Sequence, residues 1–297
     1  MSKKIDLISG VCGFYKIETI LDDVVTSSTG WFKNLITDIG LDRRAGYSDL
    51  LARCMVGTGN TTPTFSDVNL ANQIASTTSS STSSVGRSTS SPYYAYITKV
   101  YTFAQGSVSG NISEVGVGWG VSNSLFSRSL IRDGEGNPTT ITVLSSEILR
   151  VTYQLRYYAP LVDVTGVVTI NSIDYTWTAR AAEVVSSSDW TAADRAESFT
   201  FANVNNVYDG YIGSITGAPS GSSNSTIPLS VGSYSNGSFS LNYTLTIGID
   251  KGNFAAGVGA VLFTSGCSRF QIGFSPKIPK TSNDTLSIAF THGWGRS

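Results

Sequence analysis

The clearest chemical signal in the sequence is the glycine loop Gly57-Thr58-Gly59, which follows the apolar segment LLARCMV. A strand that leads into glycines is how many proteins cradle a phosphate with backbone N–H groups. Such a loop needs either the lysine of GxxxxGK[ST] or a third glycine that opens a long helix. No lysine lies between Lys33 and Lys99, and Asn-Thr-Thr-Pro follows Gly59. We therefore interpret the loop as a structural bend.

A catalytic base is the next requirement for an enzyme, and His292 is the only histidine of the chain. One histidine excludes a multi-histidine metal site, and any Ser-His-Asp triad would have to use it. His292 shares the apolar face of the last predicted strand with Phe290 and Trp294. No G-x-S-x-G elbow precedes it. We interpret His292 and Trp294 as core or interface residues.

Paired carboxylates are the other route to catalysis, because glycosidases use two of them as acid and base. Asp133 with Glu135, and Asp189 with Asp194, have a suitable spacing. Both pairs lie in turn-like sequence, where acids are usually solvated. A carbohydrate-active enzyme is thus the weaker alternative, and we expect no catalytic activity and no cofactor.

Aromatic side chains offer a binding chemistry, because their apolar faces can stack on sugar rings. Trp119 and Trp190 are the candidate glycan-stacking residues, and Trp177 belongs to the same group. Aromatic residues at alternate strand positions are more often part of a core. A carbohydrate-binding or receptor-binding surface is therefore an alternative function.

Composition limits the possible partners. The 297 residues carry a formal net charge of -1 and only 14% charged residues, against about 25% in typical soluble domains. Nucleic acid is not expected as a partner, because phosphate binding needs a basic surface. The sequence contains no run of 18 apolar residues, so no membrane span is predicted. Cys12, Cys54 and Cys267 are too few and too far apart for a disulfide framework, so we expect free thiols.

Alternating apolar and polar residues dominate the chain and predict strands with one buried face. The alternation is clear in NGSFSLNYTLTIGID (236–250), in EILRVTYQLRYY (147–158) and in DTLSIAFTHGWGRS (284–297). Asp-Gly, Asn-Pro and Asn-Gly pairs separate such segments and predict hairpin turns. The sequence therefore predicts an all-β fold of antiparallel, jelly-roll-like sandwiches.

Patterns that predict helices are few, and the chain has one candidate domain boundary. We expect a short helix at 34–40 that Gly40 ends, and another at 66–75 with Ser66 or Asp67 as its cap. We also expect a surface-exposed excursion at 76–92. A fresh set of alternating segments begins after residue 160. We therefore expect two sandwich domains, 1–160 and 161–297, with the first residues forming an N-terminal arm that a neighbouring copy could exchange.

A longer string of motifs carries a resemblance to a protein family. The segments VGTGNTTPTFSDVNLANQI, YITKVYTFAQGSVSGNISEVGVGW and LFSRSLIRDGEGNPTTITVLSSEILRVTYQLRYY follow one another within residues 31–160. This order resembles bacteriophage virion structural proteins of the tail and fibre type, including adaptor, collar and sheath subunits. The motifs hold no catalytic residues, which agrees with the absence of an acid–base constellation.

The resemblance implies a subunit made in the bacterial cytoplasm and built into the tail region of a virion. Its partners would be copies of itself, other virion proteins and a glycan or receptor of the host surface. The first residues do not read as a secretion signal, because Asp6 and Gly10 interrupt the apolar stretch. A head decoration protein is a further alternative.

One structural pair can be predicted inside these motifs. Glu114 is a lone acid in an apolar, glycine-rich strand, and Arg128 follows in LFSRSLI. An acid and an arginine on neighbouring strands can form a strong charge-assisted pair. We expect Glu114 and Arg128 to fix two adjacent strands.

Overall fold

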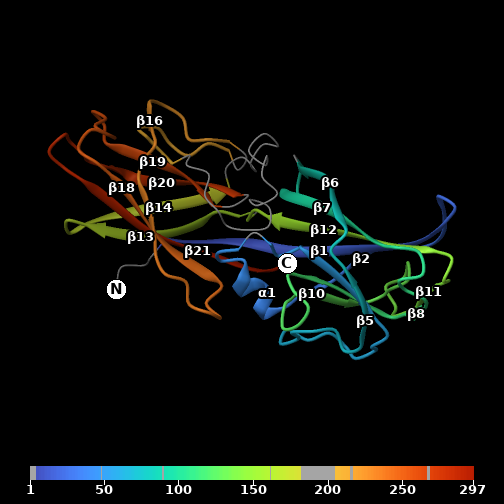
Figure 1. Cartoon of the computed structure of the whole chain (residues 1–297). Coiled ribbons are helices and arrows are strands. Elements are labelled where there is room, and N and C mark those ends of the chain that lie inside the picture. The colour runs from blue at the N-terminus through green and yellow to red at the C-terminus, as the bar shows by residue number, and fades with distance from the viewer. Residues whose placement is uncertain are drawn as a thin grey trace.

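The structure is a computed structural model that describes residues 5–47, 49–88, 90–160, 162–181, 205–214, 217–265 and 268–297. Within these ranges the chain is almost entirely β-structure, arranged in several sheets whose strands pair antiparallel with one exception. The predicted all-β fold is therefore confirmed. The molecule is elongated, and strand β1 runs along its middle (Figure 1). None of the described helices has the length and apolar character needed to cross a membrane.

An eight-stranded sheet is the backbone of the molecule. Its strands, in spatial order, are β17 (Leu229–Val231), β18 (Ser240–Ile247), β21 (Leu286–Arg296), β1 (Ile5–Leu21), β12 (Ile148–Tyr158), β7 (Tyr94–Phe103) and β6 (Ser80–Arg87), with β2 (Val24–Lys33) paired to β1 off this path. The three strands predicted most clearly from alternation are β18, β12 and β21.

Strand β1 holds this sheet together. Its residues 10–20 pair with β12 on one side, while the other side pairs first with β21 and then with β2. The β1–β21 pair is parallel. Side chains at alternate positions, such as Ile5, Leu7, Val11 and Tyr15, are buried. The segment expected as an N-terminal arm is thus a central strand of its own chain.

Two smaller sheets lie beside one end of the long sheet. The five-stranded sheet has the order β3 (Leu35–Ile36), β10 (Leu125–Leu130), β9 (Glu114–Gly118), β4 (Arg53–Gly57) and β5 (Gln73–Thr77). The two-stranded sheet pairs β8 (Gly110–Ile112) with β11 (Ile141–Val143). The Tyr15 hydroxyl of β1 is 2.8 Å from Ser127 Oγ of β10, so the long and five-stranded sheets pack face to face.

A six-stranded sheet covers the other end of the long sheet. Its order is β13 (Val164–Ile170), β14 (Ile173–Ala181), β20 (Ser268–Ile278), β19 (Val258–Ser265), β15 (Asn206–Tyr208) and β16 (Ser223–Ser225). The Phe263 ring of β19 lies 4.3 Å from the Phe290 ring of β21 and 5.1 Å from the Tyr243 ring of β18. These rings close a second sandwich on the same long sheet.

The expected domain boundary near residue 160 lies in the short connection between β12 and β13. The long sheet nevertheless takes strands from both sides of this boundary, namely β1, β2, β6, β7 and β12 before it and β17, β18 and β21 after it. One continuous hydrophobic cluster includes Tyr15 of the first half and Phe263 of the second. Two sandwiches are present, and they share one sheet (Figure 1).

Both predicted helices need correction. The helix expected at 34–40 is α1 (Asp38–Arg43), which starts later because Thr37 Oγ1 caps it by accepting from Gly40 N–H at 3.0 Å. Gly40 does not end this helix. Instead it lies inside the helix, where a Cβ atom would come within 2.5 Å of the Phe126 carbonyl oxygen. The first residues of the segment, Leu35 and Ile36, pair with β10 as β3.

The helix expected at 66–75 does not form. Its candidate cap, Asp67, instead accepts from Thr64 N–H at 3.0 Å, and the segment ends in strand β5. The segment expected as a surface excursion at 76–92 is exposed, as predicted, but residues 80–87 form the edge strand β6 of the long sheet.

Candidate functional site

The glycine loop that suggests a phosphate site binds a carboxylate of the same chain. Glu114 Oε1 accepts from Gly59 N–H at 3.0 Å and from Asn72 N–H at 2.7 Å. Glu114 Oε2 accepts from Ala71 N–H at 3.0 Å. Three backbone donors converge on one buried side chain, as they would on an anion. The loop is an anion nest that Glu114 already fills.

Local geometry explains why glycine is needed in this loop. Strand β9 places Glu114 directly opposite Gly57 of β4. A Cβ atom on Gly57 would lie 2.4 Å from the Asn72 carbonyl oxygen, and one on Gly59 would lie 2.4 Å from Glu114 Oε1. Only the absence of side chains lets the carboxylate reach the backbone donors.

Arg128 completes the network from strand β10. Its Nε and Nη2 atoms lie 2.9 Å and 2.8 Å from Glu114 Oε2, so the predicted Glu114–Arg128 pair is present. Nη1 binds Asp67 at 2.6 Å, and Nη2 donates to the Thr61 carbonyl oxygen at 3.0 Å. The Glu114 side chain is fully buried and that of Arg128 is 3% exposed.

This network explains the missing helix at 66–75. The N–H groups of Ala71 and Asn72 point to Glu114, and the Asp67 carboxylate points to Arg128. A helix would direct these N–H groups to carbonyls four residues earlier. The buried charges hold residues 57–72 as one closed loop.

His292 lies in the core. Its Nε2 atom is 2.9 Å from Ser9 Oγ, and both residues are buried. The Phe270 ring packs edge-on against the imidazole at 5.1 Å. Burial, reinforced by the charge of Arg44, lowers the pKa of His292 to about 3, so the ring is neutral at pH 7. Ser9 and His292 are within hydrogen-bonding distance, as the serine and histidine of a catalytic triad would be, but both side chains are buried away from solvent.

Trp294, the second residue predicted for the core or an interface, belongs to the core. It is 3% exposed, and its indole Nε1–H donates to the Leu41 carbonyl oxygen at 2.9 Å. The Tyr234 ring stacks on it at 5.8 Å and 22°. Trp294 thereby joins β21 to α1 and to the turn before β18.

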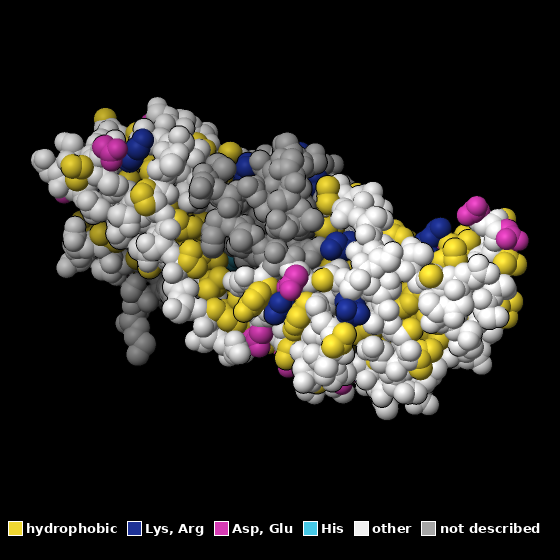
Figure 2. All heavy atoms as spheres, viewed as in Figure 1, with side chains coloured by type: hydrophobic (Ala, Val, Ile, Leu, Met, Phe, Trp, Pro, Cys, Tyr) yellow, Lys and Arg dark blue, Asp and Glu magenta, His cyan; other side chains and the backbone are white. Residues whose placement is uncertain are grey.

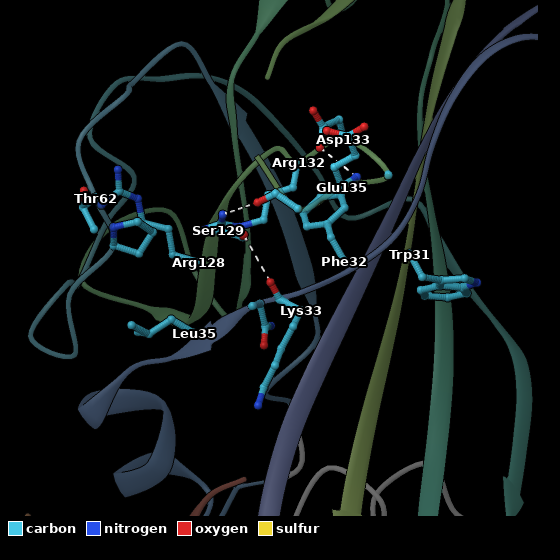
Figure 3. A pocket seen from close by; sticks show the side chains of 14 residues that line it. Trp31, Phe32, Lys33, Leu35, Thr62, Arg128, Ser129, Arg132, Asp133 and Glu135 are labelled. Carbon is cyan, nitrogen blue, oxygen red and sulfur yellow. Dashed lines mark hydrogen bonds between the residues drawn. The ribbon is translucent and has the colours of Figure 1, made fainter. Parts of the chain in front are cut away.

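A pocket of about 580 Å³ lies between the end of β2, the end of β10 and the loop 132–136 (Figure 3). The acid pair Asp133 and Glu135 lies at its rim. Asp133 Oδ1 accepts from Glu135 N–H and Asn137 N–H, both at 2.9 Å. The hydrogen bond from Asn137 N–H is the main cause that lowers the pKa of Asp133, and the one from Glu135 N–H adds to it. Asp133 and Glu135 are therefore turn residues, as interpreted from the sequence.

Trp119 lines a second pocket, of about 450 Å³, together with Tyr47 and Tyr234. The Arg43 guanidinium lies 4.6 Å from the Trp119 ring centre and 4.0 Å from that of Tyr47. Two bonds to Asp49, of 3.0 Å and 2.7 Å, hold this guanidinium in place. One face of the predicted stacking residue is therefore already covered by a cation.

Among the residues that the structure describes, Trp31 has the exposed indole, and the sequence analysis did not select this residue. Trp31 is 50% exposed, whereas Trp177 and Trp294 are buried. In Figure 3 the Phe32 ring points into the pocket and the Trp31 indole points away from it. The signal available in the sequence was the segment Trp31-Phe32-Lys33, because successive residues of a strand face opposite sides, which puts Trp31 and Lys33 on one face and Phe32 on the other.

Some predicted residues lie outside the described residues. These are the stacking candidate Trp190, the acid pair Asp189 and Asp194, and Cys267. The two described cysteines, Cys12 and Cys54, are buried free thiols.

Comparisons with known protein families, with curated proteins and with solved structures find no match to this chain.

Proposed function

We propose that this chain is a structural subunit of a bacteriophage virion. In this proposal it belongs to the tail region as a fibre, adaptor, collar or sheath component, assembles with copies of itself and contacts the host surface. Motif order within residues 31–160 supports the virion assignment by resemblance. The observation that carries the assembly part is the open edge of strand β2.

Strand β2 has the properties of an assembly edge. Within the part of the chain that the structure describes, β2 pairs only with β1. Its outer edge therefore has no strand partner among the described residues along Val24–Lys33, and only the Gly30 and Lys33 carbonyl oxygens accept side-chain hydrogen bonds there, from Thr29 Oγ1 at 2.9 Å and Ser129 Oγ at 3.5 Å. Val24 and Val25 on this strand are 65% and 46% exposed, and its only charged residue is Lys33. Proteins that remain monomeric usually protect such edges with charges, prolines or short strands.

The second long edge of the same sheet has a similar composition. Strand β6 reads SSTSSVGR and carries one charge, at Arg87. Charged side chains are also sparse over the face shown in Figure 2, where uncharged surface predominates. Low charge reduces repulsion between copies, which favours repeated association.

The native mass in solution tests the assembly part. We expect light scattering over a concentration series to show a defined oligomer, because two edges of one sheet that lack a strand partner among the described residues allow a ring or a fibre. Val25→Lys should shift the equilibrium toward the monomer by adding a charge to the open edge. Ile249→Lys, at a 57% exposed position after β18, is the matched control and should leave the mass unchanged.

A wild-type chain that stays monomeric at every concentration would overturn the assembly part. An oligomer that Val25→Lys leaves intact would show that another surface carries it. The second candidate function, a receptor-binding module of the virion, is favoured by the exposed Trp31 and its neighbours.

A further inference from the structure

Trp31 lies on the outer face of the long sheet, opposite the packed face. It is directly across from Lys16 of β1, and Lys33 lies opposite Phe14 in the next outward row. Directly opposed residues have Cβ atoms about 5 Å apart, and outward residues two positions apart on one strand are about 7 Å apart. Two lysines therefore flank one exposed indole.

The electrostatics of this face differ from those of the whole chain. Arg150 of β12 is 41% exposed at its side chain and lies on the same face as Lys16. The carboxylate in this group is Glu18, which is 2.6 Å from Lys16 and 3.8 Å from Arg150. Its side chain is only 10% exposed. Lys16, Lys33 and Arg150 together thus outweigh one shielded carboxylate.

A bulge fixes the position of the indole. The pairing of β1 and β2 shifts register between Lys16 and Glu18, opposite Thr29 and Gly30 of β2. Gly30 has a φ of 70°, and Thr29 Oγ1 accepts from Ile17 N–H at 3.0 Å in place of a strand partner. Bulges of this kind re-aim the neighbouring side chain. Trp31 therefore follows a bulge that a hydrogen bond stabilises.

We propose that Trp31, Lys16, Lys33 and Arg150 form a binding surface for an acidic polysaccharide. The indole supplies an apolar platform for the C–H face of a sugar ring. The lysines and Arg150 pair with carboxylate or phosphate groups on the neighbouring sugars. This inference rests on the host-contact part of the proposed function and names the chemistry of the contacted surface.

The observations favour an acidic glycan over a neutral glycan and over nucleic acid. A neutral sugar would add no negative charge to a surface where Lys16 and Arg150 share the single carboxylate of Glu18 and Lys33 adds a third positive charge. Nucleic-acid binding usually requires a strongly basic domain, and this chain has a net charge of -1. The basic character here is confined to a patch around one indole.

Binding of defined oligosaccharides to the full chain tests the proposal. The probes are a hexamer of mannuronic acid, maltohexaose as its neutral counterpart, and a single-stranded oligo(dT) of similar length. We expect the hexuronate to bind with a Kd of about 1 mM, typical of a weak single site. The affinity should fall as salt is added, since the contacts are exposed ion pairs.

Single substitutions test which residues form the binding surface. Trp31→Ala should weaken hexuronate binding about tenfold or more, with an unchanged melting temperature because the side chain is half exposed. Lys33→Gln and Lys16→Gln should each weaken it less and reduce the salt dependence. Lys251→Gln, which removes a positive charge in the turn after β18, is the matched control and should bind as the wild type does.

Several outcomes would overturn the inference. These are no hexuronate binding at about 10 mM, ten times the expected Kd, binding that Trp31→Ala leaves unchanged, equal binding of maltohexaose, or tighter binding of oligo(dT). Light scattering on the same samples separates this failure from failure of the assembly proposal. A monomer that binds hexuronate retains the site, and an oligomer that does not bind it retains the assembly.

Discussion

The Glu114 carboxylate accepts a hydrogen bond from the backbone N–H of Gly59 at 3.0 Å, across 55 residues of sequence. This contact converts a loop that resembles a phosphate cradle into a structural clamp. The clamp uses the same physics as an anion site, namely converging backbone donors and a neighbouring guanidinium. The difference is that the anion is covalently part of the chain.

Removing this anion should destabilise the protein strongly. Glu114→Ala leaves the buried Arg128 guanidinium without its main counter-charge and three N–H groups without an acceptor. Breaking a buried pair from one side costs about 3–5 kcal/mol. Urea unfolding should show this loss, while Asp133→Asn in the exposed turn should change the unfolding free energy far less. Equal stability of the two variants would contradict the clamp.

Gly59→Ala should be destabilising even though it adds only a methyl group. That methyl would lie 2.4 Å from Glu114 Oε1 and 2.6 Å from the Ala71 Cβ atom. Overpacking of this kind costs about 1–3 kcal/mol. Gly134→Ala is the control, because a Cβ atom there meets nothing within 4 Å. Thermal unfolding should show a lower melting temperature for Gly59→Ala than for Gly134→Ala and the wild type.

Stability should fall with acidification through His292. Its pKa is about 3 in the folded chain and near 6.5 when unfolded, so the unfolded state takes up a proton first. The contribution of His292 is complete above pH 6.5 and is lost as the pH falls toward 3. The slope is about 1.4 kcal/mol per pH unit, or about 2 kcal/mol between pH 6.5 and 5.

His292→Gln provides the comparison for that slope. The variant lacks the titrating group, so its unfolding free energy should change less between pH 6.5 and 5 than that of the wild type. Urea unfolding at four pH values in this window measures both slopes. Parallel slopes would show that His292 is protonated, or solvated, in the folded chain.

Trp294→Ala should also be strongly destabilising, by about 3–5 kcal/mol for a fully buried indole. The substitution removes the contact with Tyr234 and the hydrogen bond to the Leu41 carbonyl oxygen. Trp31→Ala removes the same side chain from an exposed position and serves as the control. A melting temperature equal to that of the control would contradict the packing of β21.

Deletion of residues 1–25 should abolish folding and not merely assembly. It removes β1, which pairs with β12, β21 and β2 and contributes buried side chains along its length. The expected result is loss of the cooperative thermal transition in circular dichroism. A deleted chain that still unfolds cooperatively would restore the idea of a separable N-terminal arm.

The predicted helices show where reasoning from sequence reached its limit. The segment 66–75 has a cap residue and an apolar face at helical spacing, yet the distant Glu114 takes two of its N–H groups. The sequence predicts Gly40 as a helix end, whereas the structure places it inside α1, where the Phe126 backbone leaves no room for a side chain. Local propensity is weak, and contacts between distant segments override it.

The candidate site residues divide in the same way. The Glu114–Arg128 pair could be predicted, because an isolated acid in an apolar strand requires a partner nearby. Trp119 could not be assessed, because the cation that covers it, Arg43, comes from α1. Trp31 was missed, because exposure depends on which strands neighbour β2.

The sequence by itself determined that the chain is β-structure and which side chains of β12, β18 and β21 point inward, because a strand alternates its faces with a period of two. Only the tertiary structure decided that β21 pairs parallel to β1, that two sandwiches share one sheet, and that Ser9 meets His292 across 283 residues. Strand partners are chosen by the packing of whole sheets, and no local pattern encodes that choice.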